Sequence, residues 1–261
     1  MISVTFAASW TLAAAVLLLG AGTAESQKRT PCTEEAMLVF DASGSMAGNE
    51  MLGIATTITR IDKVRRALAK VLPSVTKARR VGLISYGPGP YNQCNVELNM
   101  KPRENAGDAI MSAVNRLIPA GKTPLAAAVE EAAEILDYRY KQGLIVVLTD
   151  GEETCGGRPC ELAKQLHAAA EQLTIHVVGF RVRDFSWTGE QSVLDIMCLA
   201  EQSGGLYIAA QSEDELVEAL EKTLGCPMLS RRETTYSAAS LTYWPFATGQ
   251  AAQSSVSESI R

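Results

Sequence analysis

Five residues in three separate stretches of the sequence carry side-chain oxygens that could bind a hard metal ion. They are Asp41, Ser43, Ser45, Thr123 and Asp150. Carboxylates combined with hydroxyls suit Mg²⁺, which prefers oxygen ligands, keeps several of its waters and demands near-octahedral geometry. Each stretch alone is weak evidence, because Ser, Thr and Asp are also common in helix caps and turns. Whether the five residues form a site depends on the elements that position them.

Short apolar strands alternate with amphipathic helical stretches along the chain. We expect strands at 36–41, 81–86, 94–100, 144–149, 174–180 and 206–210. Near-continuous apolar strands separated by helices are typical of α/β proteins whose sheet is covered on both faces. The sequence therefore predicts a Rossmann-like, doubly wound, mostly parallel six-stranded sheet with helices on both faces.

Several helices begin with a recognisable signal. Thr59 and Asp62 are spaced as a capping box, and Ser212 with Glu215 repeats that pattern. Pro159 suits the first turn of another helix. Apolar residues at helical spacing predict the remaining helices. They are Val114, Leu117 and Ile118 for one helix, Leu125, Val129, Ala132 and Leu136 for the next, and Val193, Met197 and Ala200 for a later one.

The connections place the candidate ligands at one edge of the sheet. The link between strands 81–86 and 94–100 is too short for a helical crossover, so these strands should be antiparallel, with 94–100 as the polar edge strand. Asp41 and Asp150 each follow directly from an apolar strand. Thr123 precedes a helix that has Pro124 in its first turn. Ligands of open α/β sheets bind beyond the carboxyl ends of the strands, where all three stretches should meet.

This combination resembles the von Willebrand factor type A family and its metal-ion-dependent adhesion site. The family pattern DxSxS corresponds to Asp41, Ser43 and Ser45, its separate threonine to Thr123, and its later aspartate to Asp150. The resemblance spans about residues 33–226. The stretch 47–58 looks longer than its counterpart in the family, which leaves the shape of the binding surface open.

The resemblance implies a metal-dependent, adhesion-type protein-binding module rather than an enzyme. The serines and the threonine would bind Mg²⁺ directly, with Mn²⁺ or Ca²⁺ as alternatives, and the aspartates would act largely through water. An Asp or Glu carboxylate of a partner protein would then complete the coordination of the ion. Two other readings stay open: a metal-dependent phosphatase, although Ser43 stands where the haloacid-dehalogenase type needs a second aspartate, and a structural domain whose site is unused.

Other motifs are incomplete. Gly121-Lys122-Thr123 imitates the end of a phosphate-binding loop, but Arg116 stands where that loop needs a glycine. The two histidines, His167 and His176, fall inside a predicted helix and a predicted strand, as packed or surface residues do. The loop around Tyr91 is either part of the partner-binding surface or a plain hairpin connection.

The N-terminal residues have the composition of an export signal. The first 24 residues contain no charged side chain, and their apolar run, 6–19, is too short to span a membrane. Small residues at Gly22 and Ala24 precede a cleavage site before Glu25. We expect a signal peptide at 1–24, with an uncleaved anchor as the alternative, and a periplasmic or extracellular location.

The rest of the chain divides into three parts. A lead-in at 25–32 precedes the patterned domain at 33–226, and a tail at 227–261, rich in Ser, Ala, Thr and Gln, should be flexible. No other segment reaches transmembrane length, so we expect no integral membrane segment in the mature chain. The net charge of −5 argues against a nucleic-acid partner.

Six cysteines in an exported chain indicate a disulfide framework, although six allow 15 pairings. Two of them flank a short Gly-Gly-Arg-Pro loop, and two others bracket the patterned region. The predicted disulfides are Cys155–Cys160, Cys32–Cys226 and, by elimination, Cys94–Cys198. A zinc site is the alternative, but the sequence has neither a CxxC pair nor ordered histidines to support it.

Overall fold

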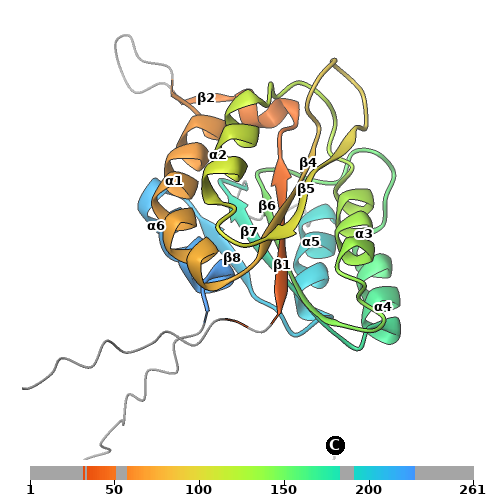
Figure 1. Ribbon diagram of the computed structural model, residues 1–261. Coiled ribbons are helices and arrows are strands. Elements are labelled where there is room, and N and C mark those ends of the chain that lie inside the picture. Colours follow the sequence, from red (N-terminus) through yellow and green to blue (C-terminus); the bar gives the residue numbers. More distant parts are fainter. Residues whose placement is uncertain (1–31, 33, 51–57, 183–190, 227–261) are drawn as a thin grey trace, which may run out of the picture. The chain divides into compact units, whose positions relative to one another are not determined.

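A six-stranded sheet forms the centre of the protein (Figure 1). The computed structural model describes residues 32, 34–50, 58–182 and 191–226. The strands of the sheet are β1 (Glu35–Asp41), β4 (Val81–Tyr86), β5 (Val96–Arg103), β6 (Gln142–Thr149), β7 (Gln172–Phe180) and β8 (Tyr207–Ala210). Their order is β5-β4-β1-β6-β7-β8, and every neighbouring pair is parallel except β4 and β5. The predicted sheet, with its antiparallel edge strand, is confirmed.

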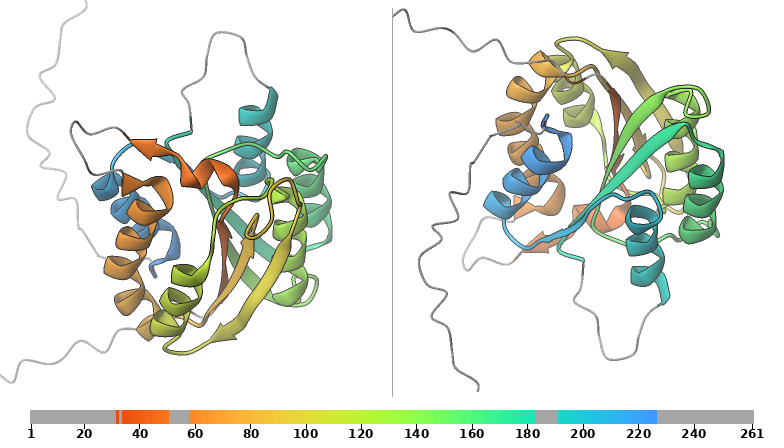
Figure 2. Two further views of the ribbon diagram at one scale, coloured as in Figure 1. Left: turned by 90° about the horizontal axis from the view of Figure 1, so that it is seen from above. Right: turned by 90° about the horizontal axis from the view of Figure 1, so that it is seen from below.

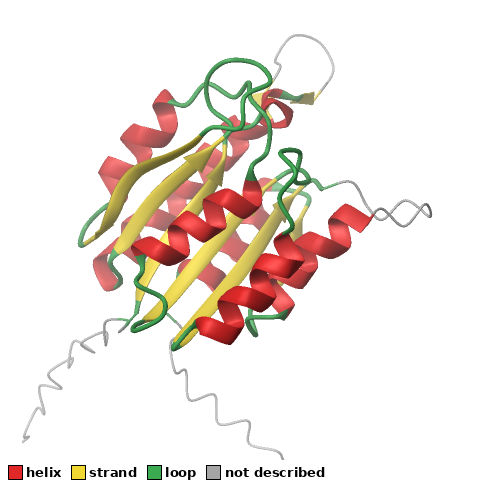
Figure 3. Ribbon diagram, turned by 90° about the vertical axis from the view of Figure 1, so that its right-hand side faces the viewer, coloured by secondary structure: helices red, strands yellow, loops and turns green. Residues whose placement is uncertain are grey.

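Helices cover both faces of the sheet, as Figures 2 and 3 show. One face carries α1 (Arg60–Ala78), α2 (Gly107–Arg116) and α6 (Glu213–Leu224), and the other carries α3 (Leu125–Ile135), α4 (Pro159–Ala169) and α5 (Gln191–Glu201). In β1, Leu38 and Phe40 pack toward α1, while Met37 and Val39 pack toward α3. Alternate residues of the central strand therefore enter two separate cores, which is why the strand reads as one continuous apolar run.

The ends of the helices follow the predicted signals with two exceptions, the start of α3 and the end of α2. Pro124 was predicted in the first turn of α3, but it occupies the N-cap and the helix begins at Leu125. Thr59 and Asp62 form a capping box at the start of α1, and Ser212 caps α6 by accepting a hydrogen bond from the amide of Glu215. The prediction that Leu117 and Ile118 continue α2 is wrong. The helix ends at Arg116, Leu117 has extended backbone geometry and Ile118 is 72% exposed.

A contact from another helix explains the end of α2. The guanidinium of Arg65, on α1, donates hydrogen bonds to the carbonyl oxygens of Val114 and Leu117. It thereby satisfies carbonyls that a helix end leaves without partners. This contact joins residues about fifty positions apart, so local spacing gave no sign of it.

A short antiparallel hairpin stands beside the sheet. It consists of β2 (Asn49–Glu50) and β3 (Ile58–Thr59). The 3₁₀ turn η1 (Gly44–Ala47) precedes it. Most of the long stretch 47–58 falls on residues 51–57, which lie outside the described residues, as do the predicted signal peptide at 1–24 and the predicted tail at 227–261.

Three disulfides connect the elements, and one of the three predicted pairings is confirmed. Cys32 is bonded to Cys226, with Cα atoms 5.7 Å apart. The predictions Cys155–Cys160 and Cys94–Cys198 are wrong. The observed pairs are Cys94–Cys155 and Cys160–Cys198.

The elements that carry the cysteines explain the correction. Cys160 is the second residue of α4, which packs against α5, so it meets Cys198 on that helix. Cys155 stays in the loop after β6, where it meets Cys94 in the loop before β5. Closeness in sequence was therefore a poor guide, because Pro159 starts a helix between the two cysteines. The disulfides are consistent with an exported protein. No helix among the described residues is long and apolar enough to cross a membrane.

Candidate metal centre

The candidate site lies at the carboxyl end of β1, where the strand order reverses. The chain leaves β1 through α1 to reach β4 on one side, whereas β6, on the other side of β1, is reached through α3 on the opposite face. The two connections diverge at this point, leaving a crevice above the strand ends. Asp41 is the last residue of β1, and Asp150 follows the last residue of β6. The topology thus brings together two carboxylates that are 109 residues apart.

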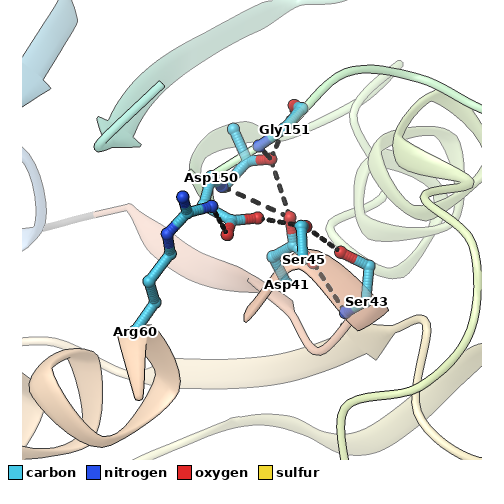
Figure 4. Close-up of polar contacts among 7 residues, drawn as sticks. Asp41, Ser43, Ser45, Arg60, Asp150 and Gly151 are labelled. Atoms are coloured by element: carbon cyan, nitrogen blue, oxygen red, sulfur yellow. Dashed lines mark hydrogen bonds and ion pairs between the residues drawn. The ribbon is translucent and has the colours of Figure 1, made fainter. Parts of the chain in front are cut away.

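Side-chain oxygens form a continuous chain of hydrogen bonds at this point (Figure 4). The hydroxyl oxygens of Ser43 and Ser45 lie 2.9 Å apart, and the Ser45 hydroxyl donates to Asp150 Oδ1 at 2.5 Å. Asp41 lies beneath them and is fully buried. Its Oδ1 accepts from the Ser43 amide at 2.7 Å, and its Oδ2 accepts from the Thr149 hydroxyl at 2.8 Å. Four of the five predicted residues are therefore in one hydrogen-bonded cluster.

Thr123, the fifth predicted residue, lines the same cleft as Ser43, Ser45 and Asp150. It lies two residues before α3, and Pro124 occupies the capping position of that helix. The Thr123 amide donates to the Thr154 hydroxyl at 2.8 Å, and its carbonyl accepts from the Thr154 amide at 3.0 Å. The backbone of Thr123 is thus held by the loop that follows Asp150, while the Thr123 hydroxyl has no hydrogen bond within the described part of the chain.

Backbone contacts join the loops that carry these residues. The Gly44 amide donates to the Gly121 carbonyl, and the Gly121 amide donates to the Gly87 carbonyl, each at 2.9 Å. Gly87 has a φ of 73°, and a Cβ atom there would lie 2.7 Å from the Cα of Ser43. A glycine is needed at this position because both the backbone angle and the close approach exclude a side chain.

The cluster opens into a cleft of about 650 Å³. Its lining includes three basic side chains, Arg60, Lys122 and Arg181, and the aromatic ring of Tyr91, which is 84% exposed. The loop around Tyr91 therefore lies beside the site. Its contact with a partner stays a prediction.

The electrostatics of the cluster are unusual because two carboxylates are buried next to each other. Burial, and then the neighbouring Asp150 carboxylate, raise the pKa of Asp41 from 3.8 to about 6, although hydrogen bonds from Ser43 and Thr149 oppose the shift. Tyr86 is the β4 neighbour of Asp41 in the sheet, and its buried hydroxyl has no hydrogen-bond partner among the described residues. Burial, followed by the Asp41 carboxylate, raises the pKa of Tyr86 well above its ordinary value.

Arg60 is a member of the cluster that the sequence did not reveal. Its Nη1 donates to Asp150 Oδ2 at 2.8 Å, so both oxygens of that carboxylate are engaged. Arg60 is the first residue of α1 and lies just outside the basic run that begins at Lys63. Thr149 was missed as well. Its hydroxyl supports Asp41 from inside a strand that reads only as apolar core.

The donor set fits a hard cation better than a soft one. The side chains that converge here are carboxylates and hydroxyls, which suit Mg²⁺, Mn²⁺ or Ca²⁺. The described residues hold no group of three or more His, Cys, Asp or Glu arranged for a metal ion. The zinc alternative fails for the cysteines, because all six form disulfides.

Comparison with known proteins identifies a matching domain family and related chains. Residues 36–153 match the von Willebrand factor type A domain family. The matched range contains all five candidate ligands. Two proteins of Bacillus subtilis (strain 168) are similar over most of their length. The uncharacterized protein YwmC is 26% identical over 202 residues, which cover 74% of this chain and 82% of YwmC. The uncharacterized protein YwmD is 28% identical over 197 residues, which cover 71% of this chain and 82% of YwmD.

Several solved structures share the fold of this chain. A von Willebrand factor type A protein of Catenulispora acidiphila superposes with a TM-score of 0.53 at 16% identity, covering 75% of this chain and 42% of that one. The pilus adhesin SpaC of Lactobacillus rhamnosus GG gives 0.54 at 17% identity, over 76% and 30%. An aerotolerance-related membrane protein of Bacteroides fragilis NCTC 9343 gives 0.52 at 19% identity, over 73% and 98%. At these identities the likeness concerns the fold alone.

Proposed function

We propose that this protein is an exported protein-binding module of the adhesion type, whose bound divalent cation captures a carboxylate of a partner protein. The observation that carries the proposal is the convergence of side-chain oxygens of Ser43, Ser45 and Asp150 at the mouth of an open cleft, directly above the buried Asp41. A metal site intended only for stability would have no need of such a cleft.

The residues divide into two roles in this proposal. The hydroxyls of Ser43, Ser45 and Thr123 are the direct ligands, and the carboxylates of Asp41 and Asp150 act through water and hydrogen bonds. A cation held mainly by neutral oxygens keeps most of its positive charge, and Mg²⁺ supplies an open coordination position for a carboxylate from outside. Asp41 already contributes in this indirect way, because its carboxylate accepts the amide of Ser43 and thereby orients that loop.

The surroundings of the cleft suit a protein partner that is drawn to a bound cation. Arg60, Lys122 and Arg181 line the cleft together with the acidic Asp150 and Glu152, and Arg60 is paired with Asp150. Because the charges of the lining are mixed, the bound cation would supply most of the attraction for a partner carboxylate. Tyr91 adds an exposed aromatic ring, a residue type that is common in protein interfaces. The fold shared with a pilus adhesin is consistent with this role.

We propose binding rather than catalysis. A cation held mainly by neutral hydroxyls is arranged to accept a carboxylate, and the metal-dependent phosphatase remains the alternative of another class. A phosphate-release assay with Mg²⁺ on a small aryl phosphate separates the two readings. Turnover by wild type that is lost in Asp41→Asn would favour the phosphatase.

Metal-dependent capture tests the proposal directly. Immobilised wild-type protein should retain a partner from extracts of the native host in Mg²⁺ and release it in chelator. Asp150→Ala should retain none of it under either condition. A partner held equally well by the wild type in chelator, or by the variant, would show that binding does not use the cation.

A further inference from the structure

The Asp150 carboxylate is shared between a ligand of the candidate site and a basic side chain. Its Oδ1 accepts from the Ser45 hydroxyl, and its Oδ2 forms an ion pair with Arg60 at 2.8 Å (Figure 4). The Asp150 side chain is fully buried, whereas the Arg60 side chain is 26% exposed. The guanidinium therefore sits at the boundary between the buried cluster and the open cleft.

The charge of the cluster explains why a cation is needed here. Asp41 and Asp150 are both buried and close enough to affect each other. Burying a carboxylate without a compensating charge is costly, and two adjacent carboxylates repel each other. In the structure it is the guanidinium of Arg60 that offsets part of this negative charge.

The position of Arg60 in its helix is otherwise unfavourable. It is the first residue of α1, where the helix dipole favours negative side chains and disfavours positive ones. The remainder of the helix follows the usual preference, with Asp62 in the first turn and Lys77 in the last. The Arg60 backbone is held in place, because its amide donates to the Gly48 carbonyl at 3.2 Å. The basic side chain at this helix start is thus explained by its contact with Asp150 rather than by the helix.

We propose that Arg60 is an intramolecular counter-cation of the metal centre, which pairs with Asp150 in the metal-free protein and competes with the divalent cation for that carboxylate. This inference rests on the proposed metal site. Like charges repel, so the arrival of a divalent ion weakens the Arg60–Asp150 pair. The exposed side of the guanidinium lets it move toward the cleft without disturbing the core. Arg60 therefore lowers the affinity of the site for the cation and stabilises the metal-free protein.

Titration of Mg²⁺ alone into Arg60→Gln, monitored by calorimetry in low salt, tests the competition. The variant should bind Mg²⁺ about tenfold more tightly than wild type. Its neutral side chain at position 60 forms no charge-assisted hydrogen bond to Asp150 that the ion would have to replace. Arg60→Lys keeps the positive charge and should remain near wild type. Arg66→Gln is the matched control, because Arg66 lies on the same helix and pairs with Glu213 instead. Its Mg²⁺ affinity should equal that of wild type.

Thermal unfolding gives an independent measure. In chelator, Arg60→Gln should unfold at a lower temperature than wild type, and saturating Mg²⁺ should remove the difference, because a ligand bound to the native state stabilises it. An equal unfolding temperature in chelator, or an equal or weaker Mg²⁺ affinity in Arg60→Gln, overturns the inference.

The wild-type titration separates this inference from the proposed function. If wild type binds Mg²⁺ and Arg60→Gln binds it no better, the inference fails and the metal site stands. If only Arg60→Gln binds, competition by Arg60 is supported. If neither binds, the metal site itself is wrong and the inference falls with it.

Discussion

Both ends of the sheet contain a buried charged cluster and a disulfide, but the two clusters differ in their charge balance. At the amino ends of the strands, the buried Arg79 donates to Glu34 at 2.5 Å and to Cys32 Sγ at 2.9 Å, beside the Cys32–Cys226 disulfide. One cation meets one carboxylate there. At the carboxyl ends, two buried carboxylates meet the partly exposed Arg60, beneath loops joined by Cys94–Cys155.

Under the proposed function, this difference in charge balance distinguishes the end of the sheet that binds the ligand from the end that does not. The Arg79–Glu34 pair is balanced in charge beside the disulfide that joins the ends of the domain, although Nε and Nη1 of Arg79 are buried without hydrogen-bond partners among the described residues. Two carboxylates with a single, displaceable guanidinium leave a site that gains from an additional cation. In the proposed function, the same elements, a buried charge and a disulfide, therefore act in stability at one end and in ligand binding at the other.

Removing the disulfide at the amino ends should have the largest effect on stability. Cys32→Ser with Cys226→Ser opens a loop of 194 residues, and loop-entropy estimates give a loss of about 5 kcal/mol in the free energy of unfolding. The Mg²⁺ affinity of the protein that remains folded should be unchanged. Denaturant unfolding and Mg²⁺ calorimetry at low temperature measure the two quantities. A large loss of Mg²⁺ affinity would remove the distinction between the two ends.

Removing the Cys94–Cys155 disulfide, which joins loops near the site, should lower both the free energy of unfolding and the Mg²⁺ affinity. Cys94→Ser with Cys155→Ser opens a loop of 61 residues, for which the same estimate gives about 4 kcal/mol. The loop that holds Thr123 loses its anchor, so Mg²⁺ affinity should fall about tenfold, as it does when supporting contacts around metal ligands are lost. Cys160→Ser with Cys198→Ser is the control, since that pair joins α4 to α5. Equal Mg²⁺ affinities in the two double variants would contradict the assigned role of Cys94–Cys155.

The dependence of stability on pH should reveal the unbalanced charge of the cluster at the carboxyl ends of the strands. The pKa of Asp41 is raised from 3.8 to about 6, so the native metal-free protein holds a proton that the unfolded chain has already released. The free energy of unfolding should therefore fall by about 2 kcal/mol as the pH rises from about 4 to about 6, and the loss should be absent in saturating Mg²⁺. Denaturant unfolding across this pH range, in chelator and in Mg²⁺, measures it.

Comparison with Asp41→Asn isolates this contribution. Asp62 and Glu213 have lowered pKa values, chiefly because of hydrogen bonds from Thr59 and Lys70 respectively. Their stabilising contributions are lost as the pH falls, so they give a slope of opposite sign at the acid end of the range. The difference between wild type and Asp41→Asn removes them. Identical pH profiles for the two proteins would show that the buried carboxylate carries no raised pKa.

Thr123→Ala should have the smallest effect on stability. Its hydroxyl makes no hydrogen bond within the described residues, and Pro124 rather than Thr123 occupies the capping position of α3, so the loss should stay below about 1 kcal/mol. Mg²⁺ binding should weaken and partner capture should be lost. Thr154→Ala makes a useful contrast, because it removes the acceptor for the Thr123 amide and should cost about 1 kcal/mol. A Thr123→Ala variant that captures the partner as wild type does would remove Thr123 from the proposed ligands.

Much of the fold could be predicted because its causes are local. Strands that are buried on both faces read as apolar runs, and β4 has the predicted boundaries, Val81 to Tyr86. Short links imply antiparallel neighbours, and capping residues mark the starts of helices. The end of α2 escaped prediction because it depends on Arg65, a side chain from a different helix.

The site was predictable as far as its residues lie at strand ends or in the short motifs that follow a strand or precede a helix. The ends of β1 and β6 brought Asp41 and Asp150 together as expected, but the sequence offered no means of placing Arg60 or Thr149 beside them. Disulfide pairing failed for a related reason. It depends on which elements face each other in space, so Cys155 pairs with Cys94 across 61 residues rather than with its near neighbour Cys160.

Calorimetric titration of Mg²⁺ into wild type and Asp150→Ala tests the central claim most directly. Asp150 lies at the end of β6, outside both apolar cores, so the variant should keep the fold and a wild-type far-ultraviolet circular dichroism spectrum. Wild type should bind one Mg²⁺, and Asp150→Ala should lose most of that affinity, because one of the two carboxylates that attract the ion is gone. Equal Mg²⁺ affinity in the two proteins would contradict the metal centre and the mode of binding proposed from it.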